Sequence, residues 1–200
     1  MASEGFLKKC DSVVDALYPE HKDALGREML LDQFSIMSWT KKDYYVNCWH
    51  LNDQESAVMW KIYAPLEEAV CITTSYSDLV TCLPDWIDIG RVKYVDYRRD
   101  IIDPTFQYDL IMSKRLSFRH EREIRAVVWS KTDKLKANNK EFNSDPEGLI
   151  VPIDPSCIIK TVYLSPNSPP DFKVAVEGVL RAYHCAADVR QSEVNAPPAY

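Results

Sequence analysis

Short segments rich in β-branched and aromatic residues recur between residues 44 and 190, and segments with helical spacing separate them. The clearest is 44–50, Tyr-Tyr-Val-Asn-Cys-Trp-His, which is typical of a strand. The other predicted strands are 69–74, 91–97, 124–129, 149–153, 158–164 and 187–190. The apolar segment 69–74 is expected to be buried. This pattern predicts an α+β protein with a central mixed or largely antiparallel sheet of about six or seven strands.

Two helices are predicted before the first strand. One ends at Pro19, and the other covers 23–38, where Leu25 and Met29 recur at helical spacing. We expect both to pack on the sheet. Later helices are predicted at 56–63, 76–83 and 170–183.

The chain is predicted to form a single domain, because 200 residues suit one core and no linker or repeat interrupts the sequence. Residues 1–42 would be its N-terminal helical part, 43–194 the core that contains the sheet, and 195–200 a frayed tail. The polar segment 131–147 predicts an exposed, mobile loop.

Charge and composition exclude several classes of site. The net charge of -6 argues against broad electrostatic binding of nucleic acid, although it leaves room for a local basic patch. Only 5 glycines are present, and no phosphate-binding loop or dinucleotide fingerprint occurs. The four histidines have no metal-binding spacing, so no metal site is expected.

The six cysteines are scattered singly, and no signal peptide is evident. They are predicted to be reduced, mostly buried thiols without a disulfide, in a reducing, cytoplasmic compartment. No apolar run approaches the roughly 18 to 20 residues that span a bilayer, so a soluble protein is expected.

The densest group of charged residues lies at 114–125. Within it, Glu121, Glu123 and Arg125 are spaced two apart, and such residues project from the same face of a strand. A row of this kind can position a ribose hydroxyl, stabilise a developing cation or clamp a phosphate. The alternative is a solvated strand face with alternating salt bridges.

Two further groups lie at predicted strand ends. Trp49 and His50 end the first strand, where polar and aromatic side chains often contact ligands; alternatively, they are packing or capping residues. Thr73, Thr74 and Ser75 end the second strand. Their hydroxyls can hold a ligand or orient a carboxylate, or they can cap the next helix.

The order of these motifs resembles a widespread family of uncharacterised proteins, known as a domain of unknown function. The resemblance covers roughly residues 43 to 165 and includes a W-x-x-Y stretch from Trp60 to Tyr63, followed by F-x-x-E-x-E-x-R from Phe118 to Arg125. It implies no activity.

More distantly, the order of elements resembles the ADP-ribosyltransferase fold, including toxins that modify DNA bases. The resemblance implies that His50 holds the ribose of NAD, that the hydroxyls at 73–75 shape the nicotinamide pocket, and that Glu123 is catalytic. The chain departs from the pattern in two ways: the usual Ser-Thr-Ser is replaced and shifted at 73–75, and Arg125 is not part of the motif.

The resemblance implies an enzyme that cleaves the nicotinamide–ribose bond of NAD and transfers ADP-ribose to a nucleic-acid or protein acceptor. Glu123 would stabilise the oxocarbenium-like transition state and Glu121 would steer the acceptor. Arg115 or Arg125 would hold the pyrophosphate, and Trp49 or Tyr63 would stack on a ring.

Two alternatives remain open. The same pocket could belong to a non-catalytic module that binds a nucleotide or a protein partner. A nuclease acting through Glu121 and Glu123 is a weaker alternative, because no Asp or His completes a metal site with them.

Overall fold

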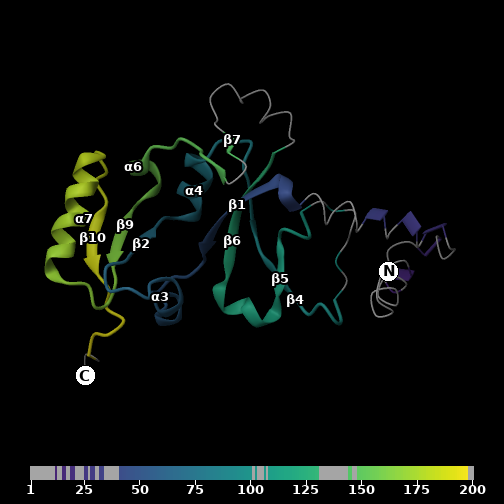
Figure 1. The fold of residues 1–200 in the computed structure, drawn as a ribbon, viewed down its shortest axis with the longest axis horizontal. Coiled ribbons are helices and arrows are strands. Elements are labelled where there is room, and N and C mark those ends of the chain that lie inside the picture. Colours follow the sequence, from purple (N-terminus) through teal and green to yellow (C-terminus); the bar gives the residue numbers. More distant parts are fainter. Residues whose placement is uncertain are drawn as a thin grey trace. The chain divides into compact units, whose positions relative to one another are not determined.

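The structure is a computed structural model (Figure 1). It describes residues 12, 15–16, 19–20, 25–26, 28–29, 32–33, 41–100, 102, 106, 108–130, 144–145 and 148–197. The predicted packing of the N-terminal helices lies outside these residues, as do most of the predicted loop at 131–147 and the end of the tail. None of the helices in the described ranges combines the length and hydrophobicity needed to cross a bilayer.

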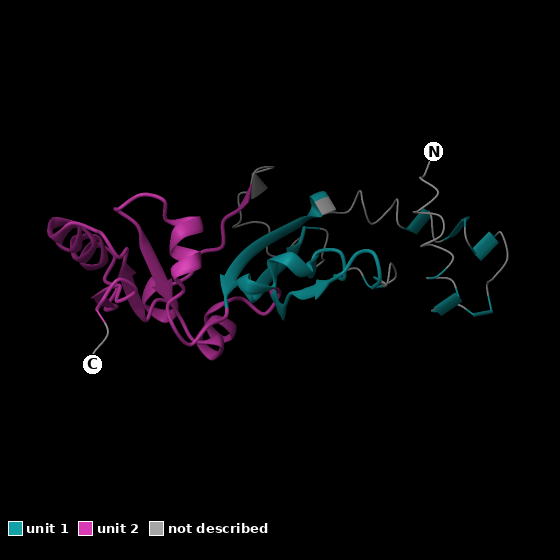
Figure 2. Ribbon diagram, turned by 90° about the horizontal axis from the view of Figure 1, so that it is seen from below, with its two compact units in different colours: residues 1–50, 88–141 teal, residues 51–87, 142–200 magenta. Residues whose placement is uncertain are grey.

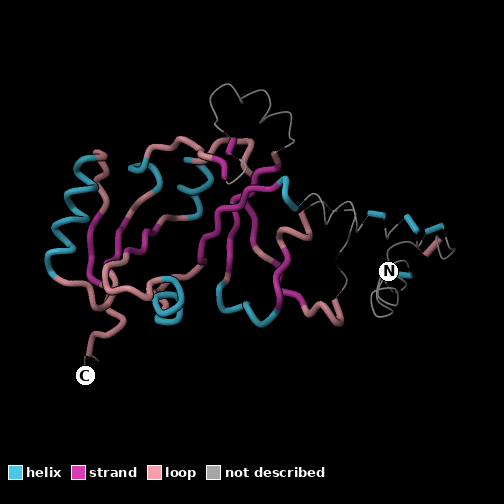
Figure 3. The backbone as a smooth tube through the Cα atoms, viewed as in Figure 1, coloured by secondary structure: helices cyan, strands magenta, loops and turns pink. Residues whose placement is uncertain are grey.

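The predicted α+β class is confirmed, but the predicted central sheet is wrong. The strands of the described residues form two three-stranded and two two-stranded sheets (Figure 3). The chain divides into two compact units, 1–50 with 88–141 and 51–87 with 142–200, here called unit 1 and unit 2 (Figure 2). Most strands in the described residues have four residues or fewer. The single-domain expectation stays a prediction.

In unit 1, strand β6 (Glu123–Trp129) is the middle strand of the larger sheet. On one side it pairs antiparallel with β1 (Tyr44–His50), which follows the 3-10 helix η1 (Lys41–Asp43). On the other side it pairs antiparallel with β3 (Asp88–Arg91). Strands pair with both edges of β6, and most of its residues are buried.

A second, smaller sheet in unit 1 pairs β4 (Lys93–Val95) in parallel with β5 (Ser113–Arg115). The predicted strand at 91–97 is therefore two strands. The break falls at Val92, whose N–H donates to the Glu123 carbonyl at 3.0 Å. The 3-10 helix η2 (Leu116–Glu121) follows β5 and leads into β6.

In unit 2, strand β9 (Thr161–Leu164) is the centre of a sheet. It pairs antiparallel with β2 (Val70–Thr73) and in parallel with β10 (Asp188–Gln191), and helix α7 (Pro170–Ala182) connects β9 to β10. The expectation that β2 is buried is wrong, because it is an edge strand with exposed side chains.

Helix α3 (Ala57–Tyr63) forms as predicted, and Ser56 caps it by accepting the Met59 N–H at 3.3 Å. The indole N–H of Trp60 donates to Glu55 at 2.9 Å. The other oxygen of Glu55 accepts the Glu193 N–H at 3.2 Å. These contacts give Trp60 a structural role in unit 2.

Unit 2 also contains α4 (Tyr76–Cys82), α6 (Pro155–Ile158), and a short pair of strands, β7 (Ser144–Asp145) with β8 (Gly148–Leu149). A disulfide joins Cys82 to Cys157, so the prediction of reduced cysteines without a disulfide is wrong for this pair. The two residues are 75 positions apart, and only the packing of α4 against α6 brings them together. Cys48, Cys71 and Cys185 are free thiols.

The core of unit 2 gives a stability prediction. Leu164 is 1% exposed, whereas Leu66 of the same unit is 74% exposed. Leu164→Ala should lower the free energy of unfolding by about 2 to 5 kcal/mol, because it leaves a cavity under the sheet. Leu66→Ala should change it by less than about 0.5 kcal/mol. Urea denaturation of both variants measures the difference, and equal effects would contradict this description of the core.

Candidate functional site

The candidate site lies where β1 ends and β6 begins, within unit 1. His50 is paired with Glu123, and Cys48 with Arg125, across the antiparallel ladder. Directly opposite residues in such a ladder point to the same face of the sheet. The predicted spacing of Glu123 and Arg125 on one strand face is therefore confirmed, and His50 shares that face.

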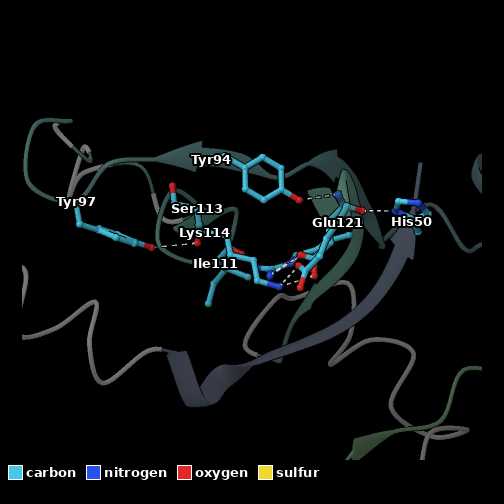
Figure 4. Close-up of polar contacts among 9 residues, drawn as sticks. His50, Tyr94, Tyr97, Ile111, Ser113, Lys114 and Glu121 are labelled. Carbon is cyan, nitrogen blue, oxygen red and sulfur yellow. Dashed lines mark hydrogen bonds and ion pairs between the residues drawn. The ribbon is translucent and has the colours of Figure 1, made fainter. Parts of the chain in front are cut away.

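Glu121, in contrast, is not on a strand, so the predicted row of three side chains on one strand is wrong at this position. Glu121 ends η2, and Arg122 follows in the left-handed region at φ 43°. This conformation is uncommon for residues other than glycine, and it turns the chain sharply into β6. Both carboxylates nevertheless reach the same partner, Lys114 on β5. Figure 4 shows the side chains of Lys114 and Glu121 pointing toward one another.

The four charged side chains form one network, here called the Lys114 network: Lys114, Glu121, Glu123 and Arg125. The Lys114 ammonium contacts Glu121 and lies 3.0 Å from Glu123 Oε1. Arg125 donates to Glu123 Oε2 from Nε at 2.8 Å, and its Nη2 lies 2.7 Å from the same oxygen. Arg125 also donates to the Ile111 carbonyl. The two negative charges of the glutamates are therefore balanced by the two positive charges of Lys114 and Arg125.

Burial distinguishes this network from a solvated strand face with salt bridges. The side chains of Glu121 and Glu123 are 7% and 10% exposed, whereas that of Lys114 is 24% exposed. Lys114 is thus the member of the network most open to solvent. Carboxylates at this depth remain charged only when cations or hydrogen-bond donors compensate them.

The carboxylates also change the properties of their neighbours. Burial alone would lower the pKa of Lys114, but its hydrogen bonds and charge interactions with Glu121 and Glu123 outweigh burial, so the pKa is raised. The Glu123 N–H donates to the Tyr94 hydroxyl at 2.8 Å. Burial raises the pKa of Tyr94, and the charges of both glutamates act in the same direction. Tyr94 therefore keeps its proton and can donate it in a hydrogen bond.

One ring nitrogen of His50 makes a hydrogen bond, and the other has no hydrogen-bond partner. Its Nδ1 contacts the backbone carbonyl of Glu121. A carbonyl can only accept, so Nδ1 carries the proton; when the ring is neutral, Nε2 then has a lone pair. That Nε2 is buried and has no hydrogen-bond partner. Because buried polar atoms almost always have partners, Nε2 is a candidate for contact with a ligand donor. The indole nitrogens of Trp49 and Trp129 in unit 1 are also buried without a partner, but an indole N–H can only donate.

The other predicted site residues are not members of the Lys114 network. Thr73, Thr74, Ser75 and Tyr63 belong to unit 2, and Tyr63 is exposed at the end of α3. Ser75 accepts the Asp78 N–H at 3.0 Å and caps α4, as the alternative interpretation expects.

Hydrogen bonds also involve the two threonines. Thr73 donates to the Thr161 carbonyl at 3.3 Å, and Thr74 to the Ser75 carbonyl at 3.4 Å.

In unit 1, the Arg115 guanidinium lies over the Tyr97 ring at 5.3 Å. The indole nitrogen of Trp49 is buried without a partner, on a residue that points to the face opposite His50.

Sequence reasoning missed the central roles of Lys114 and Tyr94. The two are direct partners in the parallel pair of β4 and β5. Lys114 begins the charged run at 114–125, and this position is a weak indication in the sequence that it belongs to the site. No spacing in the sequence connects Tyr94 to Glu123. In the described part of the chain, no group of three or more metal-ligating side chains is gathered.

Removing Lys114 tests whether the network is important to the fold. Lys114→Met should lower the free energy of unfolding by about 2 to 5 kcal/mol, because it leaves buried carboxylates without their cation. The matched control is Lys173→Met on α7, which removes an exposed pair 3.9 Å from Glu177 and should cost less than about 0.5 kcal/mol. Denaturant unfolding compares the two, and similar losses would contradict the central place given to Lys114.

The raised pKa of Lys114 predicts a dependence of stability on pH. A raised pKa in the folded state means that stabilisation is complete below the unfolded value of 10.5 and is lost as pH rises through the higher folded value. Wild-type stability should therefore fall more steeply above pH 10.5 than that of Lys114→Met. Parallel slopes in alkaline unfolding curves would refute this assignment.

Comparisons with known proteins found no relative of this chain. No family model matches the chain, and neither a curated protein nor a solved structure matches it. The basis for a functional conclusion is therefore the chemistry of His50 and the Lys114 network.

Proposed function

We propose that unit 1 carries an NAD site at the end of β1 and the beginning of β6, in an ADP-ribosyltransferase-like enzyme. The enzyme would cleave the nicotinamide–ribose bond and transfer ADP-ribose to a nucleic-acid or protein acceptor. The observation that carries the proposal is the buried, unpartnered Nε2 of His50 beside the buried carboxylates of Glu121 and Glu123.

The two carboxylates suit a reaction that develops positive charge. As nicotinamide leaves with the bonding electrons, the ribose becomes oxocarbenium-like, and a nearby carboxylate stabilises it. In the free protein the Lys114 ammonium already contacts both carboxylates, which shows that this position favours a cation. The anionic pyrophosphate of NAD would draw the partly exposed Lys114 outward, and the ribose cation would take its place beside Glu123.

The other side chains fit supporting roles in this proposal. His50 Nε2 would accept a hydrogen bond from a ribose hydroxyl. Arg125 would orient Glu123, since its guanidinium is already engaged with that carboxylate and with the Ile111 carbonyl. In this proposal Lys114, in place of the Arg115 or Arg125 expected from the sequence, is the cation that contacts the pyrophosphate. Glu121 would steer the acceptor and take the proton that the acceptor loses as it attacks the ribose.

One observation favours a second candidate, a non-catalytic module that binds a nucleotide. Both carboxylates already have cationic partners, so the network is complete without a reaction to perform. The same His50 would then accept a hydrogen bond from a bound nucleotide that is never cleaved. Release of nicotinamide separates the two candidates, because only the enzyme forms this product.

Glu123→Gln tests the enzyme directly. The carboxylate stabilises charge that exists only near the transition state, so its loss should reduce turnover more than affinity. We expect nicotinamide release to fall by about 10² to 10³ while NAD binding by calorimetry is largely retained. Glu121→Gln should impair transfer to the acceptor more than hydrolysis by water. Glu177→Gln, on the exposed surface of α7, is the matched control and should leave both unchanged.

Each outcome has a distinct meaning, provided that thermal unfolding shows the variants to be folded. Equal release by wild type and Glu123→Gln would remove Glu123 from the mechanism. NAD binding without release by the wild type would favour the binding module. Absence of NAD binding would refute both the enzyme and an NAD-binding module.

A further inference from the structure

The disulfide of unit 2 joins two short helices, α4 and α6. Cys82 is the last residue of α4, and Cys157 lies in α6, with Cα atoms 6.0 Å apart. Helix α6 has four residues, which is too short for a helix to be stable by itself. Its own support is the Asp154 cap, which accepts the Ser156 N–H at 2.9 Å.

The non-covalent contacts between the two helices are limited. Leu79 of α4 and Ile158 of α6 are buried. Lys160, just after α6, lies 3.3 Å from Asp78 of α4. That ion pair is largely exposed, and such pairs add little stability. The disulfide is therefore the strongest described link between α4 and α6.

We propose that the Cys82–Cys157 disulfide is a redox-controlled cross-link and that its oxidation state sets the stability of unit 2. Both cysteines are only half-buried, so a small thiolate can approach them. One thiolate of a dithiol reductant attacks the sulfur of one cysteine, which breaks the S–S bond, forms a mixed disulfide and releases the other cysteine as a thiolate. The second thiolate of the reductant then attacks the reductant's own sulfur in the mixed disulfide and releases the first cysteine. The reductant supplies two electrons and two protons and leaves as its own disulfide, while Cys82 and Cys157 become thiols.

The effect on stability should be large because the bond closes a long loop. The linked residues are 75 positions apart, and cross-links over longer loops restrict the unfolded chain more. In the reduced state the described contacts that remain between the α4 and α6 regions are the buried Leu79 and Ile158 and the ion pair of Lys160 with Asp78. The Lys114 network belongs to unit 1 and contains no cysteine, so reduction leaves it intact.

The test is thermal unfolding of the full chain with and without dithiothreitol, combined with hydrogen exchange resolved by peptide. Reduction should lower the Tm on the order of 10 °C. It should speed exchange in α4 and α6 and leave β6 unchanged. Cys82→Ser/Cys157→Ser should match the reduced wild type and no longer respond to dithiothreitol. Cys71→Ser, which removes a free thiol of unit 2, should respond like the wild type.

Alkylation before reduction identifies the bonded residues. Cys82 and Cys157 should be protected in denatured, unreduced protein, whereas Cys48, Cys71 and Cys185 should be modified. Modification of Cys82 and Cys157 under these conditions would overturn the proposal. An unchanged Tm in dithiothreitol, or an equal change of exchange in β6, would overturn it too. The wild-type measurements decide the matter even if the double variant does not fold.

Discussion

Burying the carboxylates of Glu121 and Glu123 is unfavourable unless cations accompany them, and this constraint organises unit 1. Lys114 and Arg125 supply the cations. To do so, β5 must lie beside β4, and the segment that contains Ile111 must pass close enough to accept a hydrogen bond from Arg125. The small parallel sheet and the larger antiparallel sheet are thus connected through charge as well as through apolar packing.

The backbone between the two glutamates makes this convergence possible. Side chains two apart on a straight strand share a face, but the left-handed Arg122 allows a 3-10 helix to end and a strand to begin within that interval. The same turn exposes the Glu121 carbonyl to His50 Nδ1, which sets the tautomer of the ring. The availability of Nε2 for a ligand therefore depends on the turn at Arg122.

The sequence predicted features that rest on local pattern, and it failed where distant segments meet. The strands at 44–50 and 124–129, the helix at 170–183 and the cap at Ser75 follow from periodicity and local hydrogen bonding. The edge position of β2, the division into small sheets and the Cys82–Cys157 bond depend on which segments pair, and residue spacing does not encode this. The sequence indicated Glu123 by its spacing in the charged run and His50 by its place at a strand end, whereas the contacts of Lys114 and Tyr94 with Glu123 are seen only in the folded chain.

We propose that His50 Nε2 is a free acceptor in an NAD site, and 15N NMR of the histidine ring tests this most directly. The signal can be assigned by comparison with His50→Gln. In the free protein, the account predicts the neutral tautomer with its proton on Nδ1 and an unbonded Nε2. Addition of NAD should shift the Nε2 resonance in the direction of an accepted hydrogen bond while the Nδ1 proton stays in place. A ring protonated on Nε2, or an Nε2 resonance unchanged at saturating NAD, would contradict the account.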